Sequence, residues 1–190
     1  MENRKDVNRC KWCTNDPIYQ AYHDNEWGVP RFDDQILFEM LILEGAQAGL
    51  SWITILKRRE NYKQAFEGFN VDKVANYGSE EVDRLLNDSS IIRNKLKIKS
   101  AIRNAQVFKQ IQNEYGHFSR YIWEYVGGRP IVNSFISADQ VPVTSQIAIA
   151  LSKDLKKRGM SFVGPIIMYS YMQSIGMVND HTLDCFIRKK

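Results

Sequence analysis

The feature of this sequence that most restricts its fold is a set of four cysteine and histidine residues divided between its two ends. Cys10 and His23 lie near the start, and His181 and Cys185 lie near the finish. Three residues separate the second pair, so on a helix both side chains would face the same way. Two thiols and two imidazoles are a usual ligand set of a closed structural zinc site, which leaves no open metal position for catalysis. Such a site would tie the two ends of the chain together.

Spacing alone leaves other interpretations of these residues open. Cys10 and Cys13 form a CxxC pair, so Cys13 could replace Cys10 as a ligand, or the pair could be redox-active. No strand-rich pattern typical of a thioredoxin-like fold surrounds the pair, which argues against the redox function. Each of these residues could also be an ordinary buried side chain, since free cysteine often behaves as a small hydrophobe.

Most apolar residues recur with the period of an α-helix, which predicts an all-α protein. The segment 34–48 is apolar nearly all round, as in a buried central helix, and the amphipathic segment 91–114 predicts the longest helix. We expect Ser51 and Thr144 to be N-caps, and we expect 127–143 to be an irregular connection. Shorter helices are expected in six further segments: 51–66, 71–77, 79–86, 118–126, 144–157 and 162–175.

The length of 190 residues fits a single domain. We expect a central helical body at about 34–176. The N-terminal segment 1–33 and the C-terminal segment 177–190 would then be joined by the bound zinc. Asp180 is expected to cap a last helix that runs through Cys185.

Charge and composition narrow the classes of protein. The net charge of +4 is compatible with a polyanionic partner but is not diagnostic. The chain has no apolar run of about 18 residues, so we expect no transmembrane helix. Its charged start lacks the apolar part of a secretory signal. Together with an odd number of cysteines, this predicts a cytoplasmic protein in a reducing setting. Nothing indicates an obligate protein partner or more than a monomer.

A second pattern concerns nucleic acid. Gly159 and Gly164 lie five residues apart between two predicted helices, as a helix-hairpin-helix requires. Glycine turns let the backbone N–H groups approach a phosphate, and the basic residues 156–158 add positive charge. The alternative is an ordinary helical hairpin in which Gly159 ends the first helix. The basic cluster 93–99 could contact DNA or could be a solvated helix face.

The third pattern is an acidic residue in an apolar helix. Glu44 must find hydrogen-bond donors or shift its pKa if it is buried, so it is a candidate site residue. The alternative is that it faces solvent or a lysine. Aromatic residues are frequent in the N-terminal segment, where they could be core or could wall a pocket for a flat base: Trp12, Tyr19, Tyr22 and Trp27.

Several segments resemble the 3-methyladenine DNA glycosylase I family. They are DPIYQAYHDNEWGVP at 16–30, LEG at 43–45, QAGLSW at 47–52, IIR at 91–93, the stretch 159–164, and NDH at 179–181. The resemblance extends from Cys10 to Cys185 and implies a helix-hairpin-helix glycosylase fold. It also implies that a structural Zn²⁺ is bound by Cys10, His23, His181 and Cys185, with Cys13 outside the site. The implied activity is excision of 3-methyladenine from alkylated double-stranded DNA, leaving an abasic site without strand cleavage.

Residue by residue, the resemblance makes Glu44 the carboxylate that accepts from the amino group of the base. The aromatic walls would be Tyr22 and Trp52, with Trp12 and Tyr19 beside them. A member of the family has Gln where this chain has Ala46, so no polar contact is expected there. Neutral adenine would gain little from such a pocket, which suits a cationic base. The implied DNA contacts are Gly49, Leu50 and Ser51, which would enter the duplex, and Arg93, Arg158, Gly159 and Gly164.

Overall fold

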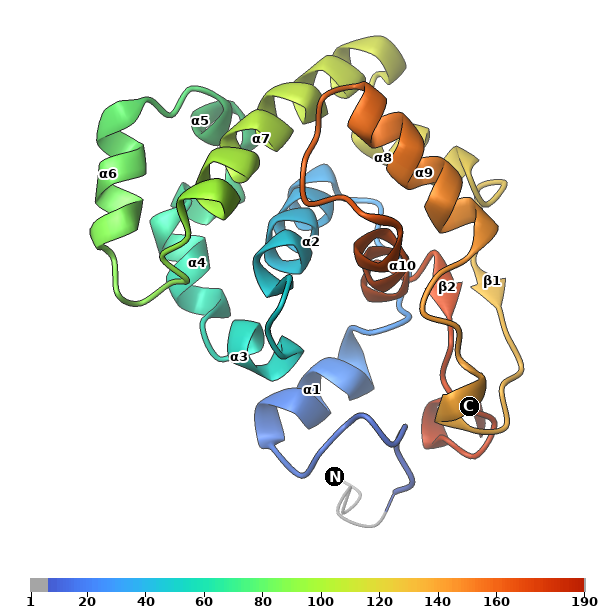
Figure 1. Ribbon diagram of the computed structural model, residues 1–190. Coiled ribbons are helices and arrows are strands. Elements are labelled where there is room, and N and C mark those ends of the chain that lie inside the picture. Colours follow the sequence, from blue (N-terminus) through green and yellow to red (C-terminus); the bar gives the residue numbers. More distant parts are fainter. Residues whose placement is uncertain (1–6, 190) are drawn as a thin grey trace.

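The computed structural model describes residues 7–189, and its regular structure is almost entirely helical (Figure 1). The α-helices are α1 Pro17–Asn25, α2 Asp34–Gln47, α3 Trp52–Leu56, α4 Arg59–Ala65, α5 Val71–Ala75, α6 Ser79–Asn87, α7 Lys95–Tyr115, α8 Phe118–Glu124, α9 Gln146–Lys157 and α10 Pro165–Ser174. The 3-10 helices are η2 Glu67–Phe69, η3 Ala138–Gln140 and η4 Phe186–Lys189. The expected terminal segments also include residues 1–6 and 190, which lie outside the described residues.

Helix α2 is the central helix that its apolar sequence predicts. The side chain of Asp33 accepts a hydrogen bond from the backbone N–H of Ile36 and so caps the helix. Leu37, Phe38 and Leu43 are completely buried because helices pack against α2 on several sides, among them α7, α8 and α10. Figure 1 shows α2 in the middle of the molecule, beside α10 and below the diagonal of α7.

Two helix starts differ from the expected ones because a different side chain caps them. Helix α7 begins at Lys95 rather than at residue 91, since the side chain of Asn94 accepts from two backbone N–H groups of the first turn. Helix α9 is capped by Ser145 and not by Thr144, whose hydroxyl donates to the backbone carbonyl of Pro165 instead. The segment 51–66 forms α3 and α4 rather than one helix, and Ser51 makes no side-chain cap bond to the backbone.

The last expected helix is absent, because Asp180 does not cap one. Its carboxylate accepts hydrogen bonds from Asn133, Tyr169 and Gln173. The chain before it forms the short strand β2, Val178–Asn179, which pairs in parallel with β1, Ile131–Val132. A turn then follows, and η4 begins only after Cys185. The two ends of the described chain meet here, since the backbone N–H of Phe186 donates to the carbonyl of Asn8.

Helices α9 and α10 form a hairpin whose turn contains the two predicted glycines. Gly159 has a φ of +101°, and a Cβ atom there would lie 2.6 Å from the guanidinium of Arg103, so only glycine fits without a shift. Gly164 is the N-cap of α10 and is followed by Pro165 at the first helical position. Among residues 7–189, no helix is long and apolar enough to cross a membrane.

Candidate active site and metal centre

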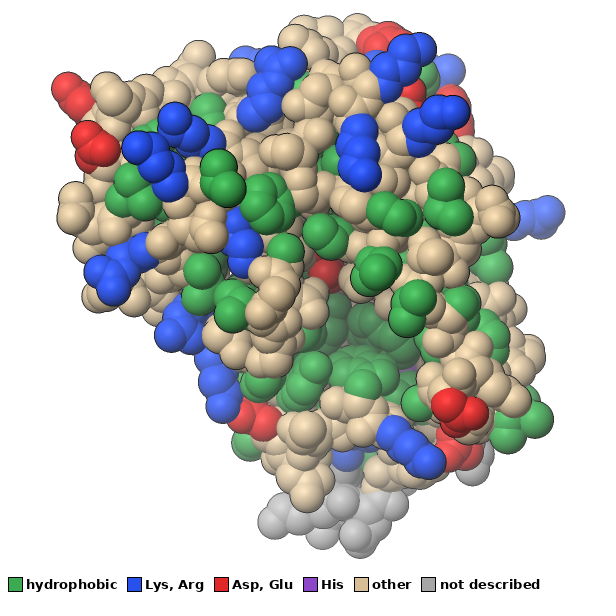
Figure 2. All heavy atoms as spheres, in the orientation of Figure 1, with side chains coloured by type: hydrophobic (Ala, Val, Ile, Leu, Met, Phe, Trp, Pro, Cys, Tyr) green, Lys and Arg blue, Asp and Glu red, His purple; other side chains and the backbone are tan. Residues whose placement is uncertain are grey.

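A cavity of about 310 Å³ opens between α1, the end of α2, α10 and the loops near the C-terminus. Figure 2 shows it as a hollow floored by hydrophobic side chains, with Lys and Arg side chains above it and to its left. Its lining includes every aromatic residue that the sequence assigned to a pocket. The lining residues are Cys10, Trp12, Tyr19, Tyr22, Trp27, Glu44, Gln47, Trp52, Ala138, Val141, Pro142, Ser170, Gln173, Asp180 and Thr182.

The walls of the cavity are aromatic faces that contact one another. The ring centroids of Tyr22 and Trp52 lie 5.4 Å apart and their planes are tilted by 58°. Trp12 lies 5.1 Å from Tyr19 and 4.9 Å from Trp27 between centroids. Because these rings brace one another, the cavity presents fixed flat surfaces to a ligand.

Glu44 lies in the last turn of α2 and lines the cavity, with only 3% of its surface exposed. Burial raises the pKa of its carboxyl to about 8, against a lowering contribution from a hydrogen bond with Ser174. Its Oε2 atom has no hydrogen-bond partner among the described residues. The pocket therefore holds a buried acceptor that protein groups leave unpaired.

Two buried donors in the cavity are also unpaired. The indole N–H groups of Trp12 and Trp52 have no hydrogen-bond partner among residues 7–189, and both side chains line the cavity. A buried polar group without a partner destabilises the fold by about 1–3 kcal/mol. Such a cost is expected where a ligand supplies the missing partners.

Several lining residues were not predicted from the sequence. Gln47 lies in the polar interruption after Glu44, and this interruption was the available signal for it. The segment 138–142 gives no such signal, because it belongs to an irregular connection whose position depends on tertiary packing. Ser170 and Gln173 come from α10, which lies far along the chain from the aromatic residues of the walls.

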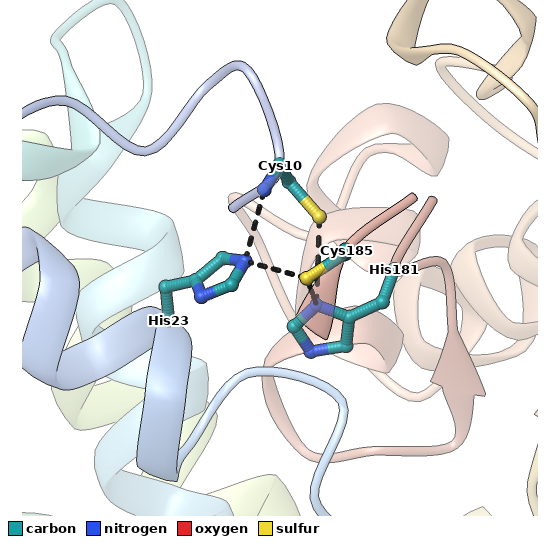
Figure 3. A group of neighbouring side chains, drawn as sticks. All are labelled: Cys10, His23, His181 and Cys185. Atoms are coloured by element: carbon teal, nitrogen blue, oxygen red, sulfur yellow. Dashed lines mark hydrogen bonds between the residues drawn. The ribbon is translucent and has the colours of Figure 1, made fainter. Parts of the chain in front are cut away.

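The predicted cysteines and histidines converge beside this cavity (Figure 3). Cys10 comes from the N-terminal loop, His23 from α1, and His181 and Cys185 from the C-terminal segment. All four side chains are buried, and one potential ligand atom from each lies within 4.8 Å of the others. The Nδ1 atom of His181 is 3.4 Å from the sulfur of Cys10 and 3.5 Å from that of Cys185.

The outer nitrogens of both histidines are held by acceptors. Nε2 of His181 donates to the backbone carbonyl of Trp27 at 3.0 Å, so Nδ1 turns its lone pair to the sulfurs. Nδ1 of His23 lies 2.9 Å from the carboxylate of Asp24, which Arg9 binds with two further hydrogen bonds. Partners of this kind fix the orientation of metal-binding histidines.

The donor set fits a tetrahedral metal ion. Zn–S and Zn–N bonds of ordinary length place a sulfur and a nitrogen ligand about 3.6 Å apart, close to the separations seen here. The hydrogen bond between the two thiols lowers the pKa of Cys185, as do those with His181 and His23, and it raises the pKa of Cys10, so Cys185 is the sulfur that favours the thiolate form that a metal binds. Cys13 is outside the cluster, and its thiol donates to the backbone carbonyl of Thr14.

The predicted DNA-contact residues occupy different surroundings. Gly49 has a φ of +78° with open space around it, and the side chain of Leu50, which follows it, is 40% exposed. The hydroxyl of Ser51 lies 2.7 Å from that of Thr54. Arg93 is exposed just before α7. The loop 49–51 thus presents an apolar side chain to solvent next to the cavity.

Arg158 differs from the other candidates because acidic and aromatic groups already surround it. Its guanidinium forms ion pairs with Glu114 and Asp154, and it lies over the rings of Tyr115 and Tyr121. These contacts connect α7, α8 and α9. The structure therefore gives Arg158 partners within the protein, while Gly159 and Gly164 are partly exposed at the turn.

Comparisons with known proteins agree on one family. The model of the methyladenine glycosylase family matches residues 12–189. The DNA-3-methyladenine glycosylase 1 of Escherichia coli (strain K12) is 48% identical over 179 residues, which cover 94% of this chain and 96% of that protein. A crystal structure of a 3-methyladenine DNA glycosylase I has a TM-score of 0.91 at 48% identity, covering 94% of this chain and 98% of that one. A variant of 3-methyladenine DNA glycosylase I in complex with 3-methyladenine has a TM-score of 0.93 at 38% identity, covering 97% and 99%.

Proposed function

Because this chain belongs to the methyladenine glycosylase family, we propose that it removes 3-methyladenine from alkylated double-stranded DNA. The reaction is hydrolysis of the N-glycosyl bond, and it leaves an abasic site. The names of the relatives and the related structure that holds 3-methyladenine support this assignment. The protein would act as a monomer in DNA repair, in the cytoplasm at the nucleoid.

The observation that carries the proposal is the set of three unpaired polar atoms in an aromatic cavity. Glu44 offers an acceptor, and Trp12 and Trp52 offer N–H donors. The edge of an adenine ring has an amino donor and ring-nitrogen acceptors, so a flipped base can satisfy such a set. Glu44 is the group that would accept from the amino group, while the faces of Tyr22 and Trp52 would stack on the ring, with Trp12 and Tyr19 beside them.

Selectivity follows from the charge of the damaged base. Methylation at N3 makes the adenine of a nucleotide cationic. Stacking of a cation on an aromatic face contributes about 0.5–2 kcal/mol, and a hydrogen bond to a charged carboxylate contributes about 1.5–3 kcal/mol. Neutral adenine gains little from either contact, and this difference selects the damaged base.

The raised pKa of Glu44 suits this role. At a pKa of about 8, most Glu44 carboxyls are protonated at neutral pH while the pocket contains no ligand. A positive charge next to a carboxyl favours its anionic form, so entry of the cationic base is coupled to loss of the proton. A neutral base does not produce this change and so binds less tightly.

The chemical step requires little from the protein. The bond between C1′ and the cationic base is already weak, and it breaks with its electron pair moving to the base. A water oxygen bonds to C1′, and its proton passes to solvent. Extraction of the nucleotide from the stack, which costs a few kcal/mol, is the larger task.

We also propose that the enzyme does not cleave the strand. No lysine is among the residues lining the cavity in the described chain, so no amine is placed to form a covalent intermediate. The carboxylate of Asp180 lines the cavity but accepts from Asn133, Tyr169 and Gln173. These bonds hold it in place, and Tyr169 and Gln173 both belong to α10.

The DNA-binding face would combine two loops in a helix-hairpin-helix fold. The turn between α9 and α10 would bind a phosphate through the N–H groups near Gly159 and Gly164. The loop 49–51 would place Leu50 in the gap left by the flipped nucleotide, with Ser51 beside it. Arg93 would contact the backbone, whereas the ion pairs of Arg158 favour a structural role for that residue.

The metal would be a structural Zn²⁺ held by Cys10, His23, His181 and Cys185. When bound, the ion would be coordinated by all four side chains and would cross-link the two ends of the chain. The whole chain would then form one glycosylase unit, with a central body at about 34–176 and the terminal segments joined through this site. The adjacent pocket would depend on this cross-link for its shape, because Cys10 lines it.

The test is chromatography of the bases released when the purified protein is incubated with alkylated duplex DNA. We expect 3-methyladenine in the soluble fraction, and we expect strands that stay intact until alkali is added. Unmethylated duplex is the control and should release nothing. If no methylated base is released, the protein is a DNA-binding module without glycosylase activity. Nicked strands before alkali treatment would exclude the monofunctional mechanism.

A further inference from the structure

The end of α2 is held by a residue from another helix. Leu50 donates its backbone N–H to the carbonyl of Gln47 at 2.6 Å, so it does not make the regular helical bond to the carbonyl of Ala46. The carbonyl of Ala48 also lies beyond the last helical turn. Carbonyls at a helix end need partners from elsewhere.

Lys97 supplies both partners from the first turn of α7. Its Nζ atom donates to the carbonyl of Ala46 at 2.7 Å and to that of Ala48 at 2.6 Å. Lys97 is partly buried, and burial lowers its pKa, whereas Lys95 and Lys99 on the same helix are exposed. An ammonium group at a helix C-terminus is favourable because the carbonyl ends of the helix carry partial negative charge.

The same side of α7 holds the turn of the α9–α10 hairpin. The side chain of Asn104 accepts from the backbone N–H of Ser161 at 3.0 Å and donates to its carbonyl at 2.9 Å. Ser100 donates its hydroxyl to the same carbonyl at 3.1 Å. The spacing of Lys97, Ser100 and Asn104, three and then four residues, places all three on one face of the helix. One rigid helix thus sets the distance between the loop 49–51 and the hairpin turn.

We propose that Lys97 is a positioning residue for base extrusion. It fixes the position and orientation of Leu50 relative to the DNA and does not contact the base. This inference rests on the proposed function, because it assigns a task to the loop 49–51 on DNA. Duplex DNA would be bound at the hairpin turn and opened at Leu50. Because α7 fixes both, Leu50 meets the duplex at a set distance from the bound phosphate, and a small displacement of a positioned group can lower a rate about 100-fold.

The experiment compares Lys97→Met with Lys109→Met, which removes another partly exposed lysine of α7, paired with Asp72. Two quantities are measured for each: single-turnover release of 3-methyladenine from duplex DNA, and the affinity for free 3-methyladenine. We expect Lys97→Met to lower duplex release about 10- to 100-fold, with free-base affinity unchanged, and Lys97→Arg to restore part of the rate. Lys109→Met should change neither quantity. Equal losses of release and free-base affinity in Lys97→Met would show damage to the pocket and overturn the proposal, as would unchanged duplex release.

A double-mutant cycle makes the test independent of any loss of stability. If Lys97 acts through Leu50, then Lys97→Met should slow duplex release in the wild-type background but cause no further slowing in the Leu50→Ala background. Additive losses in the double variant would overturn the proposal. Failure of the wild-type protein to release 3-methyladenine from any duplex would instead reject the proposed function, so the two failures are distinguishable.

Discussion

The cavity and the Cys/His cluster lie side by side, but they differ in whether their buried polar atoms have hydrogen-bond partners. Cys10 belongs to both, and Thr182 lines the cavity while its hydroxyl contacts the sulfur of Cys10. In the cluster, the inner and outer nitrogens of both histidines all have partners. In the cavity, Glu44 Oε2 and the indole N–H groups of Trp12 and Trp52 have none within the described chain.

The difference indicates that the Cys/His cluster mainly stabilises the fold, whereas the cavity is suited to binding a ligand. Paired polar groups in a buried cluster fix the local structure, whereas each unpaired group destabilises the fold by about 1–3 kcal/mol until a ligand satisfies it. Three such groups in one cavity lower the stability of the fold, and they remain available to form hydrogen bonds with a ligand. Substitutions in the cluster should therefore affect mainly stability, and substitutions in the cavity mainly activity.

The largest expected effect comes from His181→Ala. Loss of one of the four proposed ligands should abolish stoichiometric zinc binding and lower the free energy of unfolding by several kcal/mol, since metal binding to a structural site is coupled to folding. Zinc content by mass spectrometry and thermal melting measure the two effects. Cys13→Ala, which removes the cysteine outside the cluster, is the matched control and should retain the metal. A fully stable, zinc-free variant would contradict the structural role.

The second effect is expected from Glu44→Gln, which keeps the shape of the side chain but cannot become anionic when a cationic base enters. Loss of a charged hydrogen bond worth about 1.5–3 kcal/mol should lower release of 3-methyladenine by about 10- to 100-fold. Binding to abasic DNA should be retained, because the loops proposed to bind the DNA backbone are unchanged. Glu60→Gln on the exposed side of α4 is the control. Unchanged excision would exclude Glu44 from recognition of the base.

The wild type and Glu44→Gln should differ in how their stability depends on pH. Burial raises the pKa of Glu44 from its ordinary value of 4.5 to about 8, so the fold prefers the protonated carboxyl. The stability that this preference provides is complete below pH 4.5 and is lost as the pH rises toward 8, by about 1.4 kcal/mol for each pH unit. Glu44→Gln should therefore become more stable than the wild type as the pH rises through this range. Chemical denaturation at pH 5 and pH 8 measures the difference.

Activity should show the opposite trend, because the proposed function requires the anionic carboxylate of Glu44 to bind the cationic base. For the wild type, kcat/KM should rise with pH and level off above about 8, since this parameter reports ionisation in the free enzyme. Glu44→Gln should show no such rise. A rise of equal size in both proteins would assign the ionisation to another group.

The two regions also differ in how much the sequence predicted. The residues Cys10, His23, His181 and Cys185 stand out by type, and the resemblance to a family selected them over Cys13. The structure brings their ligand atoms together through a turn and not through the expected helix. The reason is that tertiary hydrogen bonds occupy the carboxylate of Asp180, which the sequence suggested as a helix cap. Local signals cannot show such a competition.

The cavity was predictable only in part. A glutamate in an apolar helix and a group of aromatics identified one side of it, since both are unusual in their local context. The other side, residues 138–142, comes from an irregular connection and depends on how that segment packs. Lys97 shows the same limit, because it belongs to a basic cluster that reads as a solvated face or a DNA contact. Lys97 donates hydrogen bonds to the carbonyls of Ala46 and Ala48 at the end of α2, which lie about fifty positions earlier in the sequence.

The smallest expected effect comes from a comparison of two tryptophans. The indole N–H of Trp123 donates to the carbonyl of Arg31 at 2.9 Å, whereas that of Trp52 has no partner within the described chain. Trp123→Phe and Trp52→Phe remove the same atoms, but only the first breaks a hydrogen bond. Trp123→Phe should therefore destabilise the protein by about 1 kcal/mol more than Trp52→Phe does, as measured by chemical denaturation.

Activity should reverse this order. Trp52→Phe should lower release of 3-methyladenine several-fold, because phenylalanine is a weaker partner for a cation than tryptophan and has no N–H donor, while Trp123→Phe should leave release unchanged. If Trp52→Phe destabilises the fold as much as Trp123→Phe, the Trp52 N–H has a partner in solution. The distinction between a satisfied cluster and an unsatisfied pocket would then rest on Glu44 and Trp12 alone.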